Sequence, residues 1–422
     1  MFSFNFSVKN ILICSWLVLL MVLFIFNIVP KYSIEKVGTR EYLSILSFVF
    51  VCIKYYKNKY YKIIIISNWS QVLLSIFAAT INGTTDFWYV QFALRNILYI
   101  NGALLIASFL PKNWNYYDYL KLIIIAITVN SIIAVISFVY PSFGEFVNSL
   151  QSFGDDERIE KTMNFGVRMI GVGSGKFYVG GIINGMGIIL TFYLMIKKEI
   201  NYFYAVILLV LLFFIGVFIA RTTIIGFAIG LLFFLKSENM IKAVWSMAGL
   251  GVLTFFLFYL GLFDSVDTSH AFEFFTTDTD SFGETSTMRS MTHMYDISFS
   301  EKTLFLGDGL SKGSAGGYYM GTDIGWMRNI LYFGIIGTIF GYLYYEIRIV
   351  GLLRKVSNEN YIFFAVWLLY LIVLNFKGLP DYNFMIFLLT AYFIMKQQKF
   401  QNDRKAIKNI RDEKGNYLLG SH

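Results

Sequence analysis

The sequence predicts an all-α polytopic integral membrane protein, and three features of its composition support this. Hydrophobic residues make up 57% of the 422 residues and give a mean hydropathy of +0.60. Charged residues make up 15%, against about 25% in a typical soluble domain. Only 4 residues are Pro, so the apolar residues form long uninterrupted runs. This composition excludes an ordinary soluble enzyme and a disordered chain.

About twelve apolar runs approach the length needed to cross a bilayer, which is about 20 residues for a helix. They form a single transmembrane domain over residues 1–422 and cover 11–29, 41–53, 63–80, 89–110, 118–140, 177–196, 202–219, 221–235, 243–262, 326–346, 361–376 and 380–396. The second, eighth and twelfth are short. No small-x-small cleavage site follows the first run, so we expect a retained span rather than a removed signal peptide.

The distribution of Lys and Arg predicts which side of the membrane each connection occupies. With a cytoplasmic N-terminus, twelve spans place 21 of the 35 basic residues on the cytoplasmic side, as the positive-inside rule expects. Both termini are then cytoplasmic, and residues 397–422 form a cytoplasmic tail. The same rule accounts for the net charge of +8 without nucleic acid as a partner.

Two large loops, 141–176 and 263–325, fall on the outer side in this topology. The second loop has 63 residues, ten of them acidic, and long loops in compact proteins are usually functional or disordered. Within it, a capping-box pattern and apolar residues at helical spacing predict an amphipathic helix over 282–299. Arg289, His293 and Asp296 share its polar face, which is either a functional surface or simply a solvated one.

Four arginines lie at or near the outer half of the predicted bilayer: Arg95, Arg168, Arg221 and Arg289. Charged residues at this depth are costly and are candidates for function. Because the guanidinium group donates hydrogen bonds in pairs and stays charged, Arg is well suited to phosphate or diphosphate. The alternative is that these side chains extend to lipid headgroups or pair with loop acids.

No motif in the sequence predicts a cofactor. Cys14 and Cys52 lie inside apolar runs and the three His residues are scattered, so neither a disulfide framework nor a zinc motif can be built from them. We therefore expect no metal and no nucleotide.

Three segments in order carry a resemblance to a known family. Leu304–Leu310 contains Gly-Asp-Gly, Tyr318–Asn329 contains Asp323, and Gly334–Gly337 forms Gly-x-x-Gly inside the tenth predicted span. This order resembles the O-antigen polymerases (Wzy-type oligosaccharide repeat-unit polymerases) and the related O-antigen ligases. In the ligases a His stands eleven residues before the Gly-x-x-Gly. Here Asp323 stands at that spacing, which looks more like the polymerases.

Further positions match the family residue by residue. Arg168 with Gly171 resembles the Arg-x-x-Gly that closes the family's first large outer loop. Arg221 resembles an Arg that opens a span after a small residue, and Arg289 resembles the loop Arg that precedes the Gly-x-Gly segment. The resemblance covers the number of spans, the placement of the loops and roughly residues 165–340. It implies a GT-C-like fold with two large periplasmic loops.

The resemblance implies a glycosyltransferase that moves a growing glycan from undecaprenyl diphosphate to the next undecaprenyl-diphosphate-linked repeat unit, in O-antigen or capsular polysaccharide biosynthesis. The developing charge on the diphosphate needs fixed cations, which Arg95, Arg168, Arg221 and Arg289 could supply. The acceptor hydroxyl needs a base, with Asp323 as first candidate and His293 as second. Arg289 completes the expected catalytic residues as a cation. The aromatic residues Tyr318, Tyr319 and Trp326 are candidates for sugar binding or for an interfacial belt.

The expected location is the bacterial cytoplasmic (inner) membrane. The expected partners are the undecaprenyl-diphosphate-linked oligosaccharide, the lipid bilayer, a chain-length regulator and a flippase. Two alternatives stay open from the sequence. One is an O-antigen ligase, which transfers the same donor to lipid A core, and the other is a transporter or flippase of lipid-linked oligosaccharides.

Overall fold

The computed structural model of the chain describes residues 8–33, 37–152, 169–173, 177–234, 296–313 and 317–419, with 245, 248–249, 251–252, 292 and 294–295 in addition. In these residues the secondary-structure elements are all helices, and β-pairing is limited to isolated bridges. Six are long and apolar enough to cross a membrane: Lys59–Ile81, Trp88–Ser108, Tyr116–Val139, Phe177–Ile196, Tyr202–Ile219 and Gly325–Ser357. The all-helical class and the multi-pass architecture are thereby confirmed.

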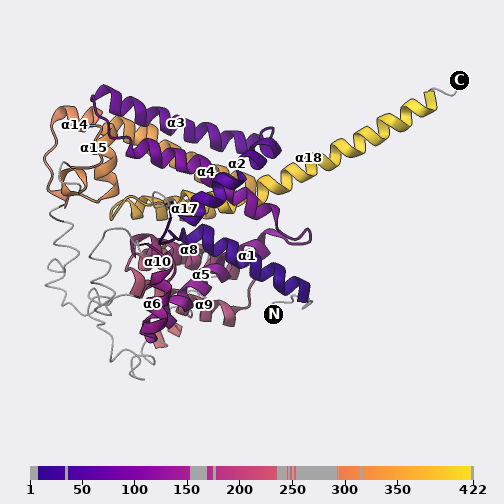
Figure 1. The fold of residues 1–422 in the computed structure, drawn as a ribbon, viewed down its shortest axis with the longest axis horizontal. Coiled ribbons are helices and arrows are strands. Elements are labelled where there is room, and N and C mark those ends of the chain that lie inside the picture. The colour runs from indigo at the N-terminus through magenta and orange to yellow at the C-terminus, as the bar shows by residue number, and fades with distance from the viewer. Residues whose placement is uncertain are drawn as a thin grey trace.

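The helices follow the predicted spans closely (Figure 1). The first half of the chain contains α1 (Val8–Phe26), α2 (Thr39–Tyr55), α3 (Lys59–Ile81), α4 (Trp88–Ser108), α5 (Tyr116–Val139) and α6 (Pro141–Ser149). The second half contains α8 (Phe177–Ile196), α9 (Tyr202–Ile219), α10 (Thr223–Gly230), α14 (Glu301–Leu306), α15 (Gly325–Gly337), α16 (Tyr344–Ser357), α17 (Tyr361–Leu374) and α18 (Asn383–Leu419). Most of the predicted span 243–262 lies outside the described residues, so the number of twelve spans stays a prediction.

Two short predicted spans differ from a plain helix. The eighth continues from α10 into one 3-10 turn, Leu231–Phe234. The twelfth continues without a break, because α18 carries the predicted tail as helix as far as Leu419. In Figure 1 this part of α18 projects from the bundle.

The connections that the sequence places in the cytoplasm meet at one end of the bundle, which we call the tail end. They are 56–58, 111–115, 197–201 and 357–360, together with 394–397 of α18. Lys197 pairs with Glu359 at 2.9 Å, and the Asn58 side-chain amide donates to Gln397 at 3.2 Å. These contacts join connections that are far apart in sequence.

The connections predicted to lie outside meet at the opposite end, which we call the α15 end. They include 82–87, 307–324 and 375–382. The Thr84 hydroxyl donates to the Gly309 carbonyl at 2.8 Å, and the Trp326 amide donates to the Asn375 carbonyl at 3.1 Å. The two groups of connections therefore alternate as the predicted topology requires, while the membrane face of each end stays a prediction.

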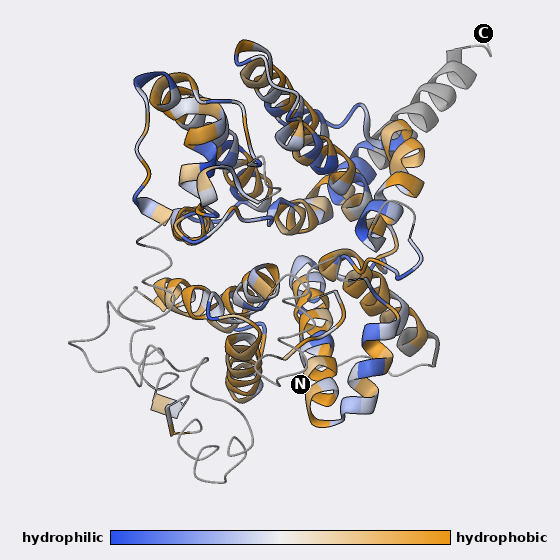
Figure 2. Cartoon of the chain, turned by 60° about the vertical axis from the view of Figure 1, so that its left-hand side comes forward, coloured by the Kyte–Doolittle hydropathy of each residue, from blue (hydrophilic) through white to orange (hydrophobic). Residues whose placement is uncertain are grey.

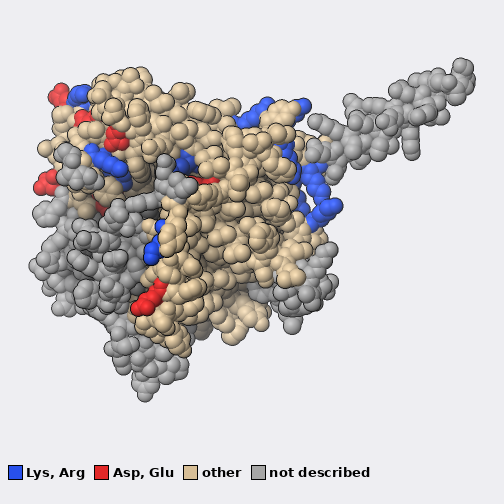
Figure 3. All heavy atoms as spheres, in the orientation of Figure 1, with Lys and Arg blue, Asp and Glu red and all other residues tan. Residues whose placement is uncertain are grey.

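The surface has the polarity of a membrane protein. Figure 2 shows hydrophobic residues along most helices, with many of the hydrophilic ones in the connections. On the face shown in Figure 3, the charged side chains around the exit of α18 on the right are basic, whereas acidic and basic side chains lie together toward the left, where α14 and α15 are.

Small residues let several helices approach closely. A Cβ added at Gly226 would lie 2.3 Å from the Cα of Gly185, so α8 and α10 meet through their backbones. A Cβ added at Gly341 would lie 2.1 Å from the Leu74 side chain of α3. These glycines therefore serve the packing of the helices.

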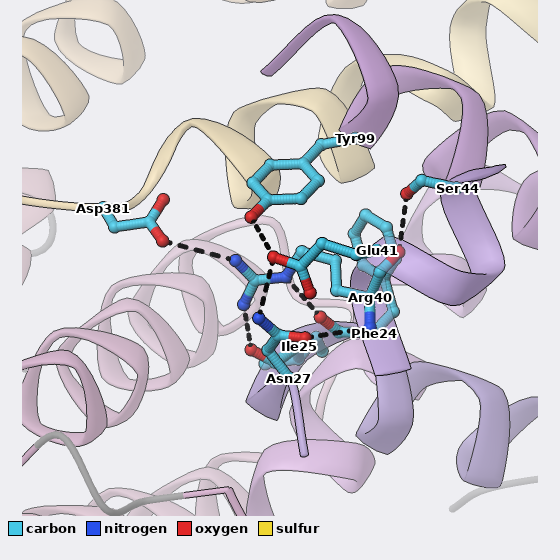
Figure 4. Close-up of polar contacts among 8 residues, drawn as sticks. All are labelled: Phe24, Ile25, Asn27, Arg40, Glu41, Ser44, Tyr99 and Asp381. Carbon is cyan, nitrogen blue, oxygen red and sulfur yellow. Dashed lines mark hydrogen bonds and ion pairs between the residues drawn. The ribbon is translucent and has the colours of Figure 1, made fainter. Parts of the chain in front are cut away.

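A buried guanidinium joins the beginning of the chain to the start of α18 (Figure 4). Arg40 is 2% exposed, and it donates to the carbonyls of Phe24 and Ile25 at 2.7 Å each. Its third partner is Asp381, at 3.5 Å, and its carbon lies 3.5 Å from the ring centre of Phe384. Because α1 ends at Phe26, these two carbonyls belong to its last turn and need donors that the helix cannot supply.

The residue after Arg40 extends this network. The Glu41 carboxylate accepts from the Tyr99 hydroxyl at 2.6 Å and from the Asn27 side-chain amide at 3.2 Å. The Asn27 side chain in turn accepts from the Arg40 amide at 2.9 Å. The cluster thus holds α1, α2 and α4 together through partnered polar groups rather than through apolar contact alone.

The tenth predicted span, 326–346, is not the continuous helix that its hydropathy predicts. Gly334 has φ +69°, which breaks the helix inside α15, and a π-helical turn, Thr338–Leu343, follows. The break deprives the carbonyls of Leu331 and Tyr332 of helical donors. The loop after α14 supplies them, because the amides of Asp308 and Gly309 donate to these carbonyls at 2.7 and 3.2 Å.

Replacing Arg40 should destabilise the protein strongly. In Arg40→Met, two carbonyls and Asp381 lose their donor, which should lower the free energy of unfolding by about 3 kcal/mol. Thermal unfolding of the detergent-purified protein measures this. Lys54→Met, at an exposed cation on the same helix, is the matched control and should unfold like the wild type. Equal stability of the two variants would contradict a stabilising role for the cluster.

Gly334→Ala should also destabilise. A Cβ at this position would lie 2.1 Å from the Phe305 carbonyl oxygen, and φ is left-handed, so we expect a loss of about 2 kcal/mol or more. Gly351→Ala in α16 is the control, because an added Cβ there meets only the Phe364 ring, at 3.8 Å. That variant should be neutral or slightly stabilising. The same thermal unfolding experiment compares the two, and a wild-type melting temperature for Gly334→Ala would show that the break is not required.

Candidate functional site

The α15 end brings together five side chains that we call the α15 site: Asp323, Arg328, Trp88, Tyr318 and Lys377. They come from the loop before α15, the first turns of α15, the start of α4 and the connection between α17 and α18. The most distant of them in sequence, Trp88 and Lys377, are 289 residues apart. We describe first what holds the loop and then the charged groups.

Asp86 fixes the loop 307–313 against the start of α4. Its carboxylate accepts from the Ser311 amide at 2.7 Å, from the Ser311 hydroxyl and from the Lys312 amide at 3.1 Å. Burial alone would raise the pKa of Asp86, but these hydrogen bonds and one from the Trp88 amide outweigh it and lower the pKa. Asp86 is therefore a charged anchor for the loop.

Asp323 lies two residues before the start of α15 and is partly buried. Burial raises the pKa of this carboxyl above its ordinary value, while the nearby cations Arg328 and Lys377 favour its charged form. A carboxylate with a raised pKa and no strong ion pair can accept a proton from a substrate hydroxyl. Its position beside two cations suits a reaction that separates charge.

Arg328 is buried at 9% exposure with an incomplete set of partners. Its guanidinium carbon lies 4.9 Å from the ring centre of Trp88 and 4.4 Å from that of Tyr318. Its Nε has no hydrogen-bond partner, and no Asp or Glu lies within ion-pair distance of it among the described residues. A buried cation between two rings with an unused donor can accept an anionic ligand.

Two neighbouring side chains in the same turn of α15 also have unused donors. The indole N–H of Trp326 and the side-chain nitrogen of Asn329 are buried without hydrogen-bond partners. The Asn329 oxygen accepts from the Tyr89 hydroxyl at 2.9 Å, which fixes the amide. Because the start of a helix also carries a partial positive charge, this turn favours an anion.

The helices around the site differ in length. The 23 residues of α3 rise about 34 Å, whereas the 14 residues of α17 rise about 21 Å. The connection 375–382 thus follows a helix that is shorter than the roughly 20 residues needed to cross a hydrocarbon core.

The aromatic candidates for sugar binding divide into two roles. Tyr318 is 50% exposed and covers Arg328, and Trp326 is partly buried beside Phe376. Tyr319 is directed elsewhere, because its hydroxyl donates to the Asp308 carboxylate at 3.2 Å. Tyr318 therefore belongs to the α15 site and Trp326 lies beside the connection 375–382, whereas Tyr319 helps to hold the loop.

Two of the predicted arginines, Arg95 and Arg221, lie in the described residues. Arg95 is exposed on α4, whereas Tyr99, one turn further along the helix, is buried against Glu41. Arg221 is buried at 8% exposure just before α10, a helix that packs against α8 and α17. Their proposed contact with the diphosphate stays a prediction.

Three candidates, Arg168, Arg289 and His293, lie outside the described residues. Of the predicted helix 282–299, residues 292 and 294–295 are described and helical, but 296–300 are not helical, so this helix ends earlier than predicted. The Tyr295 hydroxyl donates to the Phe376 carbonyl at 3.1 Å, which places the end of the segment beside the connection 375–382.

Arg328, Lys377 and Trp88 were not identified from the sequence. Arg328 stands in the motif Tyr318–Asn329, five residues after Asp323, and could have been found by examining every Arg at a loop boundary. Lys377 and Trp88 carry no comparable signal, since only the fold brings them to Asp323.

No group of three or more His, Cys, Asp or Glu side chains in the described part of the chain could hold a metal ion. Comparisons with known proteins add no identification. No family model matches the chain, and no curated protein or solved structure matches it either.

Proposed function

We propose that the chain is a glycosyltransferase of the repeat-unit polymerase type, acting on undecaprenyl-diphosphate-linked oligosaccharides in a bacterial cytoplasmic membrane. The observation that carries this proposal is the pair of Asp323 and Arg328 at the α15 end. One is a proton acceptor, and the other is a buried cation with an unused donor. The order of sequence motifs around Asp323 supports the same family.

The chemistry needs few groups. Asp323 accepts the proton of the acceptor sugar hydroxyl, while the oxygen of that hydroxyl bonds to the anomeric carbon of the donor glycan. The bond between that carbon and the diphosphate breaks, and the electron pair leaves with the diphosphate. Arg328 and the start of α15 stabilise the negative charge that the diphosphate gains. The lengthened glycan stays on the acceptor lipid, and undecaprenyl diphosphate leaves.

The proposed orientation has the α15 end in the periplasm and both termini in the cytoplasm. The basic side chains around the exit of α18 in Figure 3 support it, because basic residues favour the cytoplasmic side. A site that follows the short helix α17 suits a lipid-linked substrate, whose diphosphate lies at the membrane boundary while its chain stays in the bilayer. A chain-length regulator and a flippase are the partners that this activity would need.

Polymerisation can be tested directly. Purified protein in liposomes is incubated with an extracted undecaprenyl-diphosphate repeat unit, and the products are resolved on a gel. The wild type should give a ladder of multiples, and Asp323→Asn and Arg328→Gln should each reduce the rate about 100-fold or more. Lys302→Gln, an exposed cation on α14, is the matched control and should keep the ladder.

No ladder from folded protein with its cognate donor would overturn the polymerase. Transfer to an added lipid A core acceptor would then indicate the ligase. Movement of the lipid-linked oligosaccharide across the liposome membrane without transfer would indicate the carrier.

The rate should also depend on pH through Asp323. Only the ionised carboxylate accepts a proton, so the rate should fall as the pH drops through its raised pKa. Lys377→Gln removes a cation that favours the ionised form, so the acid limb of the profile should move to higher pH. Initial rates across a pH series measure this, with Lys302→Gln again as control. A limb that stays in place would contradict a role for Asp323 as base.

A further inference from the structure

Glu346 is an acidic side chain inside the helix bundle, away from the α15 site. It lies on α16, is 0% exposed, and packs between α3 and α18. Its carboxylate accepts from the Tyr382 hydroxyl, and the Asn383 side-chain nitrogen lies at 3.5 Å. Neither partner carries a positive charge.

Within the described residues no cation compensates this carboxyl, because no Lys, Arg or His nitrogen lies within 4.0 Å of Glu346. The side chains around it are Tyr342 and Tyr345 from the same stretch of helix, Tyr382 just before α18, and Asn68 from α3, which accepts from the Tyr345 hydroxyl. The Arg40 guanidinium is engaged by Asp381 and by two backbone carbonyls.

One acceptor beside the carboxyl lacks a donor. The Asn383 oxygen is buried without a hydrogen-bond partner. An ionised carboxylate can only accept, so it cannot satisfy this oxygen, whereas a protonated carboxyl adds one O–H that can donate to it. The Tyr342 hydroxyl beside Glu346 can donate to the carboxyl in either form. Burying a lone carboxylate is also far more costly than burying a neutral acid.

We propose that Glu346 binds a proton in the folded protein at neutral pH, so that α16 and α18 form a proton site inside the membrane. This site is independent of the polymerase proposal, because no step of that reaction uses Glu346. The site bears on the alternative function, a transporter of lipid-linked oligosaccharides, because a transporter driven by protons would need a proton-binding group inside the membrane.

Infrared spectroscopy of the protein in liposomes tests the proposal. At neutral pH the wild type should show the carbonyl stretch of a buried protonated carboxyl, and Glu346→Gln should lose it. Glu41→Gln is the matched control and should keep the band, because Glu41 lies beside Arg40 and is expected to be ionised. A band that survives in Glu346→Gln, or its absence from the wild type, would overturn the proposal.

Two further measurements do not depend on the spectrum of a variant. A hydrophobic carbodiimide reacts with protonated carboxyls in membranes, so mass spectrometry of the labelled wild type should find Glu346 modified at neutral pH. Protection of Glu346 in folded protein that is labelled elsewhere in the membrane would count against it. Glu346→Gln should also melt near the wild-type temperature, whereas Glu346→Ala, which loses the Tyr382 contact, should melt lower.

Discussion

The break in α15 at Gly334 is the feature on which the α15 end depends. A helix that stops inside a membrane protein leaves carbonyls without donors, and water is not available to satisfy them. Here the loop after α14 meets this requirement, because the amides of Asp308 and Gly309 donate to the two free carbonyls. The loop is thereby held close to α15, and Asp86 fixes its other side. The position of Tyr318 over Arg328 follows from these two attachments.

Hydropathy predicted the helices well because lipid imposes a simple requirement of about 20 apolar residues. It failed at α15 because Gly334 and its neighbours are as apolar in a broken helix as in a continuous one. Nothing in the sequence distinguishes Gly226 and Gly341, which let helices pack closely, from Gly334, which breaks the helix. The distinction depends on φ, and φ depends on the Phe305 segment that packs against Gly334.

The candidate site was predicted in part for a related reason. Asp323 and Tyr318 could be chosen because they stand in a motif with recognisable spacing. Arg95 was chosen for its depth in a predicted span, and the structure has it exposed on α4 while Tyr99, one turn further along, is buried. Sequence position gives the depth of a residue along a helix but does not show which side of that helix faces the interior of the bundle.

Residues 381–383 connect the polar interior to the site. Asp381 pairs with Arg40, and Tyr382 and Asn383 contact Glu346. Consecutive residues at the start of α18 therefore hold a cation and an acid. These contacts fix the end of the connection 375–382, whose other end accepts the Trp326 amide. The start of α15 is therefore positioned by polar groups that lie far from it in sequence. For this reason the contacts that Arg40 and Glu346 make with residues 381–383 are part of what places Asp323.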